Sequence, residues 1–381
     1  PYNFPNTDWY ELCMRNFAPE QRHNLAVRGG NETLKVYSAL GYYDQGSIYK
    51  TNSVNMQRYN FRTNIVATFK EIGLKFSSGV DAYIWDMTEP YTHQGRGSAT
   101  IWSHIVTHEP WYLGYNQYGQ LSNNPNNPLV DISSDGGYFK QQRTTVRGNM
   151  GLEWDVPFLQ GLKLKALGSY AIANDRDKAW QKTPYMYDLE GNPNEPSKPN
   201  LSKNTYYHRN FTTQFFADYN RTFNNLHSIG AMFGLEASGS DYDNSSLSRQ
   251  EYLLDIDQIA TGPVNTAKNS SSEGVSYRRA SLISRLKYDY AAKYIAEASM
   301  RYDGSDYFPR DNRWGLFFSG SLAWVISEEE FWEPLKEKHI FDMFKIRGSY
   351  GEIGLDGSTD GRLGRYEYVP SYNYNDLSLI H

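Results

Sequence analysis

Strict alternation of apolar and polar residues over long stretches is the feature that most constrains the fold of this 381-residue chain. Between Tyr294 and Asp303, tyrosine, alanine and methionine fill one parity, while glutamate, serine, arginine and aspartate fill most of the other. The pattern recurs at Ser281–Tyr290, Leu162–Tyr170 and Phe344–Tyr350. Because successive side chains of a strand point to opposite sides, each stretch predicts a β-strand with one apolar face and one charged face.

The aromatic residues gather at the ends of these predicted strands. Tyr288 and Tyr290 end one strand, Tyr294 begins the next, and Tyr302 ends it. The chain holds 32 tyrosines, yet it has no window of about 18 apolar residues, which excludes a membrane-spanning helix. Aromatic belts at both ends of alternating strands are typical of an all-β, antiparallel transmembrane barrel. The alternative from the pattern alone is a soluble antiparallel sheet with one solvated face.

The alternating stretches predict about a dozen strands. They are His23–Arg28, Leu34–Tyr43, Gln57–Thr68, Leu74–Trp85, Tyr138–Trp154, Leu162–Ala173, Tyr207–Arg221, His227–Ala237, Ser276–Tyr290, Tyr294–Asp303, Trp314–Ile326 and Phe344–Gly351. Short turns alternate along the chain with long segments rich in Gly, Asn, Ser and Pro, namely Asp44–Asn55, Asp86–Gly137, Asn174–Tyr206 and Gly239–Val275. This alternation indicates a barrel with two chemically different ends. We expect one helix, at Glu328–Phe344, capped by Ser327.

Charge and cysteine content exclude several classes of function. The net charge is −5 and the basic residues are dispersed, so nucleic acid is not an expected partner. A single cysteine, Cys13, excludes an internal disulfide framework and a cysteine-cluster metal site. The first residues, Pro1 to Trp9, lack the pattern of a signal peptide, and the tail from Arg362 to His381 lacks a strong strand, so we expect a trimmed chain.

Three stretches, in order, carry a family pattern that extends from about Asn6 to Gly354. The first stretch comprises Asn6–Tyr10 and His23–Asn31, the second comprises Tyr37–Gly46 and Arg58–Asn64, and the third comprises Arg301–Ser305, Asn312–Phe317, Ile326–Glu329 and Lys345–Gly351. Together they resemble the SusC/RagA family of TonB-dependent outer-membrane transporters. The long central segments lie outside this resemblance.

The resemblance implies that residues 1–381 are part of a 22-stranded barrel whose lumen holds an N-terminal plug. The plug and the closing strands are expected outside this sequence. The long segments near 86–137, 174–206 and 239–275 would be extracellular. The implied location is the outer membrane of a Gram-negative bacterium. The implied partners are a SusD-like surface lipoprotein, the TonB complex acting through the plug, membrane lipid, and a glycan or peptide ligand.

Candidate ligand contacts lie in the longest segment, because flat aromatic rings stack well on sugars or peptide side chains. They are Trp102, Trp111, Tyr112, Tyr115 and Tyr118. A second set of charged residues is expected to line the lumen or to contact the plug. It consists of Arg285, Lys287, Glu297 and Arg301.

The sequence contains no complete motif of a catalytic or metal-binding site. His104 and His108 have the spacing of a helical metal pair but lack the intervening glutamate of a zinc-protease motif, so a loop-surface role is expected. The acidic pairs Asp255/Asp257 and Asp303/Asp306 are interpreted as solvated loop charges. We therefore expect no enzyme, no cofactor and no metal.

The sequence predicts TonB-dependent import of an oligosaccharide or oligopeptide, without distinguishing between these cargoes. Two alternatives remain open: a soluble β-sandwich carbohydrate-binding module, and a β-rich carbohydrate-active enzyme.

Overall fold

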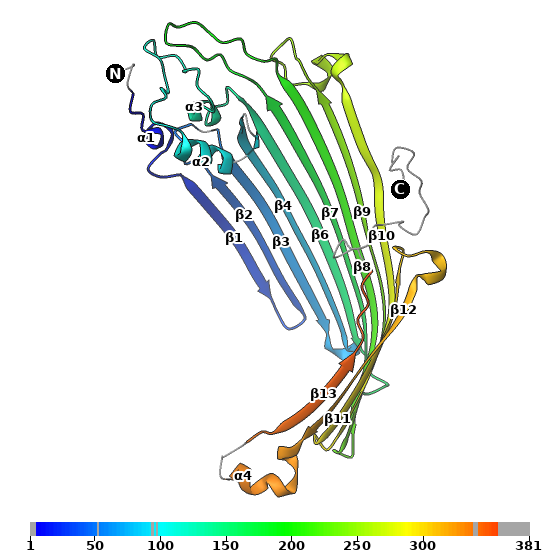
Figure 1. The fold of residues 1–381 in the computed structure, drawn as a ribbon. Helices are drawn as coiled ribbons and strands as arrows, with labels where there is room; N and C mark the ends of the chain where they lie inside the picture. The colour runs from blue at the N-terminus through cyan, green and yellow to red at the C-terminus, as the bar shows by residue number, and fades with distance from the viewer. Residues whose placement is uncertain (1–4, 52, 93–94, 97, 338–341, 357–381) are drawn as a thin grey trace, which may run out of the picture.

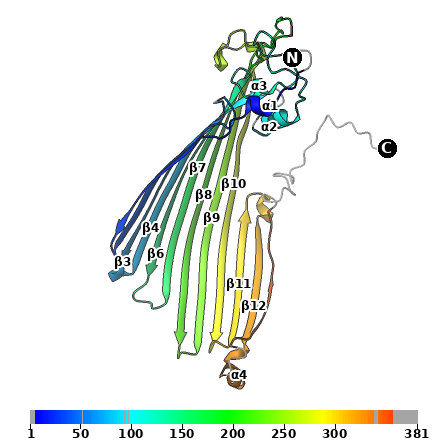
Figure 2. The same ribbon diagram turned by 90° about the vertical axis from the view of Figure 1, so that its left-hand side faces the viewer.

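A single antiparallel sheet of thirteen strands forms most of the molecule (Figures 1 and 2). The computed structural model describes residues 5–51, 53–92, 95–96, 98–337 and 342–356. The strands are β1 (Glu20–Gly30), β2 (Leu34–Gln45), β3 (Asn55–Phe69), β4 (Leu74–Thr92), β5 (Gly95–Arg96), β6 (Gly137–Asp155), β7 (Leu162–Gln181), β8 (Asn200–Phe223), β9 (His227–Arg249), β10 (Lys268–Tyr290), β11 (Tyr294–Ser305), β12 (Trp314–Val325) and β13 (Lys345–Gly351). All except β5, which pairs with β4, follow one another in chain order as a curved, open sheet.

The period-two pattern places the apolar residues of neighbouring strands on one face. Tyr290 pairs with Tyr294, and Tyr294 pairs with Trp324, so three aromatic side chains of equal parity lie in a row across β10, β11 and β12. At the other end of the same face, Gly304 pairs with Trp314. We call this face outward and the opposite, charged face inward.

The distance between the two aromatic rows matches the apolar part of an outer membrane. Trp314 and Trp324 lie ten residues apart in β12, which is about 33 Å along a strand. At a strand tilt of about 40°, this corresponds to about 25 Å along the membrane normal, the height of the apolar band of a transmembrane barrel. No helix among the described residues is long and apolar enough to cross a membrane.

Short and long connections lie at opposite ends of the sheet, except that the long connection between β12 and β13, which carries α4 (Glu333–Glu337), lies at the end of the short turns (Figure 1). The short connections are residues 31–33, 70–73, 156–161, 224–226 and 291–293, and the long ones are residues 46–54, 93–136, 182–199 and 250–267. At the tight turn before β4, Gly73 has a φ of +67°, and a Cβ there would lie 2.4 Å from the carbonyl oxygen of Asp155. Only glycine fits this position without a shift of the backbone.

The strands beside the long connections extend beyond the sequence predictions. The predicted strand Tyr207–Arg221 is part of a 24-residue strand, β8, and β9 continues to Arg249. The prediction ended these strands where the apolar alternation stops. Pairing continues past that point because each strand has an extended neighbour that satisfies its backbone hydrogen bonds.

The helix prediction was wrong in extent and in number. In place of a continuous helix at Glu328–Phe344, the structure has 3₁₀ turns at Ile326–Glu328 and Glu330–Trp332 and a short helix, α4 (Glu333–Glu337), while residues 338–341 lie outside the description. Three further helices occur: α1 (Trp9–Cys13), α2 (Ser98–Thr107) and α3 (Pro128–Asp131). They were missed because each is short and depends on packing against the others.

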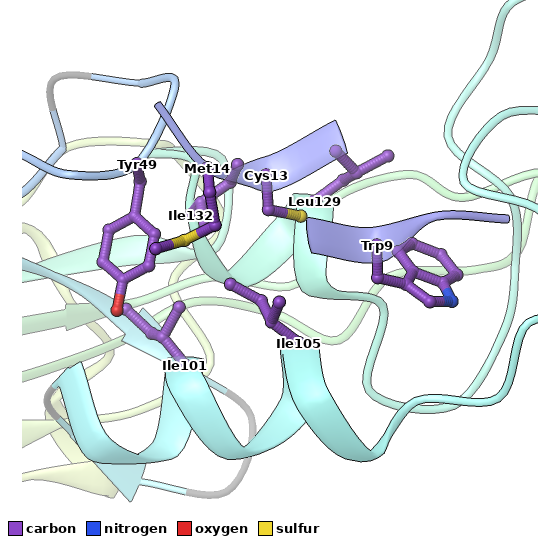
Figure 3. Close-up of a cluster of buried hydrophobic side chains, with 8 residues drawn as sticks. All are labelled: Trp9, Cys13, Met14, Tyr49, Ile101, Ile105, Leu129 and Ile132. Carbon is purple, nitrogen blue, oxygen red and sulfur yellow. The ribbon is translucent and has the colours of Figure 1, made fainter. Parts of the chain in front are cut away.

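Helices α1, α2 and α3 enclose the main hydrophobic core, at the end of the sheet that carries the long connections (Figure 3). Its buried members are Trp9, Cys13, Met14, Tyr49, Ile101, Ile105, Leu129 and Ile132. The adjoining strand β4 contacts both α2 and α3. There the paired residues Glu89 and Phe139 are buried, and both have inward parity. The helices therefore cover the inward face beside the long connections, and we call them the helical cap.

Candidate functional site

A row of charged and aromatic side chains crosses six strands on the inward face. Direct pairing in register joins Arg22 to Tyr43, Tyr43 to Arg58, Arg58 to Trp85, Trp85 to Arg143, and Arg143 to Asp175. We call these six residues the inward row. They line a hollow of about 880 Å³ together with Tyr37, Asp81 and Tyr83.

The inward row is rich in positive charge and flat rings. Arg143 forms an ion pair with Asp175 at 3.0 Å. The guanidinium of Arg58 lies 5.7 Å from the ring centroid of Tyr43, within the range of a cation–π contact. Arg22 and Arg58 form no ion pair with a described residue. The hollow therefore offers guanidinium groups for anions beside rings that can stack on a flat ligand.

Sequence reasoning missed the inward row because its members lie far apart along the chain. Each strand contributes one or two residues, and only the register of five successive strand pairs aligns them. The alternation of polar and apolar residues could have placed each residue on the inward face. It does not give the position of the residue along the barrel axis.

The predicted aromatic ligand contacts lie on and beside the helical cap. Trp102 on α2 is 47% exposed, and Trp111, Tyr115 and Tyr118 are also exposed. Tyr112 differs, because it packs against the buried core and stacks on His108 with ring centroids 5.2 Å apart. Four of the five rings are thus accessible, whereas Tyr112 has a packing role in addition to any contact with ligand.

Asn116 fixes the shape of the segment that carries Tyr115 and Tyr118. Its amide nitrogen donates to Gln120 Oε1 and to the carbonyl oxygen of Asp188, both at 2.9 Å. Its side-chain oxygen accepts from the backbone N–H groups of Tyr118 and Gln120. Because all four hydrogen-bonding positions of this buried amide are used, two long connections are held together.

The predicted inward-facing charges lie elsewhere on the same face. Lys287 and Glu297 face each other in register across β10 and β11, and Arg301 forms an ion pair with Asp303 at 3.1 Å. Arg285, opposite Ser299, shares their parity. The structure does not bring these residues together with the loop aromatics, which lie between β4 and β6.

The two histidines considered for a metal are packing residues of the helical cap. His104 is buried on α2 and hydrogen-bonds through Nδ1 to Asp131, while His108 Nε2 lies 3.0 Å from Asn124 Oδ1. Burial lowers the pKa of His108 below its ordinary value. The loop-surface interpretation was therefore wrong. The described part of the chain holds no cluster of three or more metal-ligating side chains.

The acidic pair Asp255/Asp257, interpreted as solvated, instead fastens a loop to the sheet. Asp255 accepts hydrogen bonds from Trp180 Nε1 at 3.2 Å and Lys182 Nζ at 2.7 Å. Asp257 accepts from the Tyr138 hydroxyl and from Lys178. Burial opposes ionisation of Asp257, but these two hydrogen bonds outweigh it and hold the pKa of its carboxyl below the usual value.

Aromatic packing completes this attachment. Tyr252 of the loop meets Trp180 edge to face, with ring centroids 4.9 Å apart and an interplanar angle of 89°. Tyr138, Trp180 and Leu201 are paired in register on the outward face, so the loop covers that face beyond the apolar band. We call the loop segment from Tyr252 to Ile259, with its partners, the loop latch.

Comparisons with known proteins agree with this architecture. The chain is 27% identical to the TonB-dependent receptor SusC of Bacteroides thetaiotaomicron over 97% of its length, which is 37% of that receptor. It is 25% identical to TonB-dependent receptor P39 of Formosa agariphila, over 96% of this chain and 33% of that protein. The chain thus spans about a third of the length of these relatives. No family model matches.

Solved structures show the same fold. The RagAB peptide transporter matches with a TM-score of 0.70 and 20% identity, over 91% of this chain and 38% of the other. The RagAB peptide importer in its open-open state matches with a TM-score of 0.69.

An antiparallel sheet with an apolar outward band and a charged inward face, together with these similarities, is typical of part of an outer-membrane β-barrel. The chain is similar to TonB-dependent receptors, SusC among them, over about a third of their length, and its sheet has the fold of part of such a barrel.

Proposed function

We propose that the parent protein imports a nutrient oligomer across the outer membrane, using energy delivered by TonB. The inward row is the observation that supports this role most directly. It provides cationic and aromatic groups on the inward face, which the helical cap covers beside the long connections. A cargo would contact the exposed aromatics of the cap first and then the inward row.

We further propose that a SusD-like surface lipoprotein covers the long connections. The names of the relatives include SusC and RagAB, and the exposed rings Trp102, Trp111, Tyr115 and Tyr118 lie at the end where such a lid would close. The cargo would be an oligosaccharide or an oligopeptide that carries anionic groups for Arg22 and Arg58. Transport needs no chemical change of the cargo, so we assign no enzymatic step.

The test uses the full-length parent purified with its lipoprotein, with and without replacements in the inward row. Arg58→Gln together with Trp85→Ala removes one stacking ring and one guanidinium that forms no ion pair with a described residue. We expect cargo binding to weaken by at least about 30-fold, because a charge-assisted hydrogen bond contributes about 1.5–3 kcal/mol and a ring contact about 0.5–1.5 kcal/mol. Isothermal titration with acidic and neutral oligosaccharides and oligopeptides would measure the change.

Lys75→Gln is the matched control, because Lys75 lies on the inward face near the short turns and pairs with Glu153. It should leave cargo affinity unchanged. Equal affinities of the wild type and the double variant for every ligand bound would contradict the assignment of the inward row. Absence of uptake by cells that produce the intact parent and its lipoprotein would contradict the transport proposal itself.

A further inference from the structure

Three lysines lie side by side on the outward face, beyond the apolar band. Lys140 of β6 pairs in register with Lys178 of β7, and Lys178 pairs with Lys203 of β8. Like charges directly opposite each other destabilise an antiparallel pair. We call these three residues the lysine row. Negative charge beside the lysine row would offset the repulsion between them.

The residues that the structure describes supply only part of that charge. Lys178 forms an ion pair with Asp257 of the loop latch. Lys140 instead lies 4.6 Å from the ring centroid of Tyr138. Among the described residues, no carboxylate lies within ion-pair distance of Lys140 or Lys203, nor of exposed Arg176, which shares their parity on β7.

The positive charge continues down to the edge of the apolar band. Arg209 Nε donates to Asp241 at 2.8 Å, and Arg278 Nη2 donates to the same carboxylate at 2.5 Å. One carboxylate thus lies between two guanidinium groups. The nearby outward carboxylates Asp86 and Asp243 accept hydrogen bonds from Gln142 and from the backbone of Gly274, and neither forms an ion pair with a residue that the structure describes.

These residues lie at the height of lipid headgroups. In β8 the apolar outward band ends at Phe211 on this side, apart from Leu201, which the loop latch covers. Arg209 and Lys203 lie two and eight positions beyond Phe211, toward the long connections. At about 3.3 Å per residue and a tilt of about 40°, they lie about 5 Å and about 20 Å beyond the apolar band. This layer holds the phosphates and the inner sugars of a glycolipid leaflet.

We propose that Lys140, Arg176, Lys178, Lys203, Arg209 and Arg278 form a docking surface for the phosphate groups of the outer-leaflet glycolipid, lipopolysaccharide. We call these six residues the outward basic patch. Phosphates complement it because each can accept several charge-assisted hydrogen bonds. A lipid is favoured as the occupant because the patch is continuous with the lipid-facing band and begins at its edge.

The experiment measures binding of purified lipopolysaccharide to the delipidated full-length parent in detergent. The test variant is Lys140→Gln/Arg176→Gln/Lys203→Gln, which leaves intact the ion pairs that Lys178, Arg209 and Arg278 form. The matched control, Arg28→Gln/Lys35→Gln/Arg347→Gln, removes the same charge from the inward face. Heat-modifiable mobility on gels would show that both variants fold.

We expect the test variant to bind lipopolysaccharide on the order of a hundredfold more weakly, because each basic residue near an anionic surface contributes roughly a factor of five. The control should bind like the wild type, and dephosphorylated lipopolysaccharide should bind the wild type as weakly as the intact lipid binds the test variant.

Two results would overturn the proposal. One is equal affinity of the wild type and the test variant for the intact lipid. The other is equal affinity of the wild type for the intact and dephosphorylated lipids. Self-association of the wild type that the test variant loses, without a difference in lipid affinity, would assign the patch to a protein partner instead.

Discussion

At the scale of single residues, burial decides which reactive side chains are available. Cys13, the chain's one cysteine, lies in the helical cap with no exposed surface (Figure 3). Burial raises the pKa of its thiol to about 12, since the charged thiolate loses its hydration there. Cys13 is therefore a packing residue at neutral pH, consistent with the absence of any disulfide partner.

This environment predicts the reactivity of the thiol. At pH 8 the native parent should react with a thiol reagent at least about 100-fold more slowly than the denatured chain, because reaction requires the thiolate and access to it. A time course of labelling followed by mass spectrometry would measure both rates. Rapid labelling of the native protein at Cys13 would show that the helical cap does not pack as described.

At the scale of elements, a loop and a strand extension depend on each other. The loop latch buries Trp180 and Leu201 of the extended strands and contributes the carboxylates of Asp255 and Asp257 to lysines beside them. Apolar periodicity could not predict these extensions, because their stabilising contacts come from a loop distant in sequence. The sequence therefore gave correct strand cores and incorrect strand ends.

The loop latch should open at acid pH. The pKa of Asp257 is lowered in the folded protein, so its stabilising contribution is present above the unfolded value of 3.8 and is lost as pH falls through the folded value. We expect hydrogen exchange in the segment from Tyr252 to Ile259, corrected for its intrinsic pH dependence, to be faster at pH 3 than at pH 7.

Two substitutions separate this effect from general unfolding. Asp257→Asn should accelerate exchange of the same segment at pH 7, and Asp255→Asn should do so less, because the Asp255 side chain is 62% exposed. Unchanged exchange in Asp257→Asn, or equal acceleration across the whole sheet, would rule out a local latch.

At the scale of the whole molecule, the two faces of the sheet meet different solvents. Phe215 of β8 lies outward, next to Leu235 in register, near the middle of the apolar band. Thr212 of the same strand lies inward, opposite Ser169 and Ser238. The same residue type introduced at these two positions therefore tests the orientation of the sheet in the membrane.

Phe215→Arg should destabilise the parent barrel in lipid by about 2–4 kcal/mol, the cost of arginine at the bilayer midplane. Thr212→Arg, which places the charge on the wet side, should cost less than about 1 kcal/mol. Denaturant unfolding in liposomes would give both values. A larger loss for Thr212→Arg than for Phe215→Arg would reverse the two faces.

The all-β class and the side to which each strand residue points follow from the amino-acid pattern alone, because a period of two is a local property of an extended chain. The pattern also located the strand cores and the alternation of short and long connections. The inward row, the lysine row, the loop latch and the helical cap, in contrast, arise only in the folded molecule. These depend on which residues of distant strands and loops come into register, and no local pattern specifies that pairing.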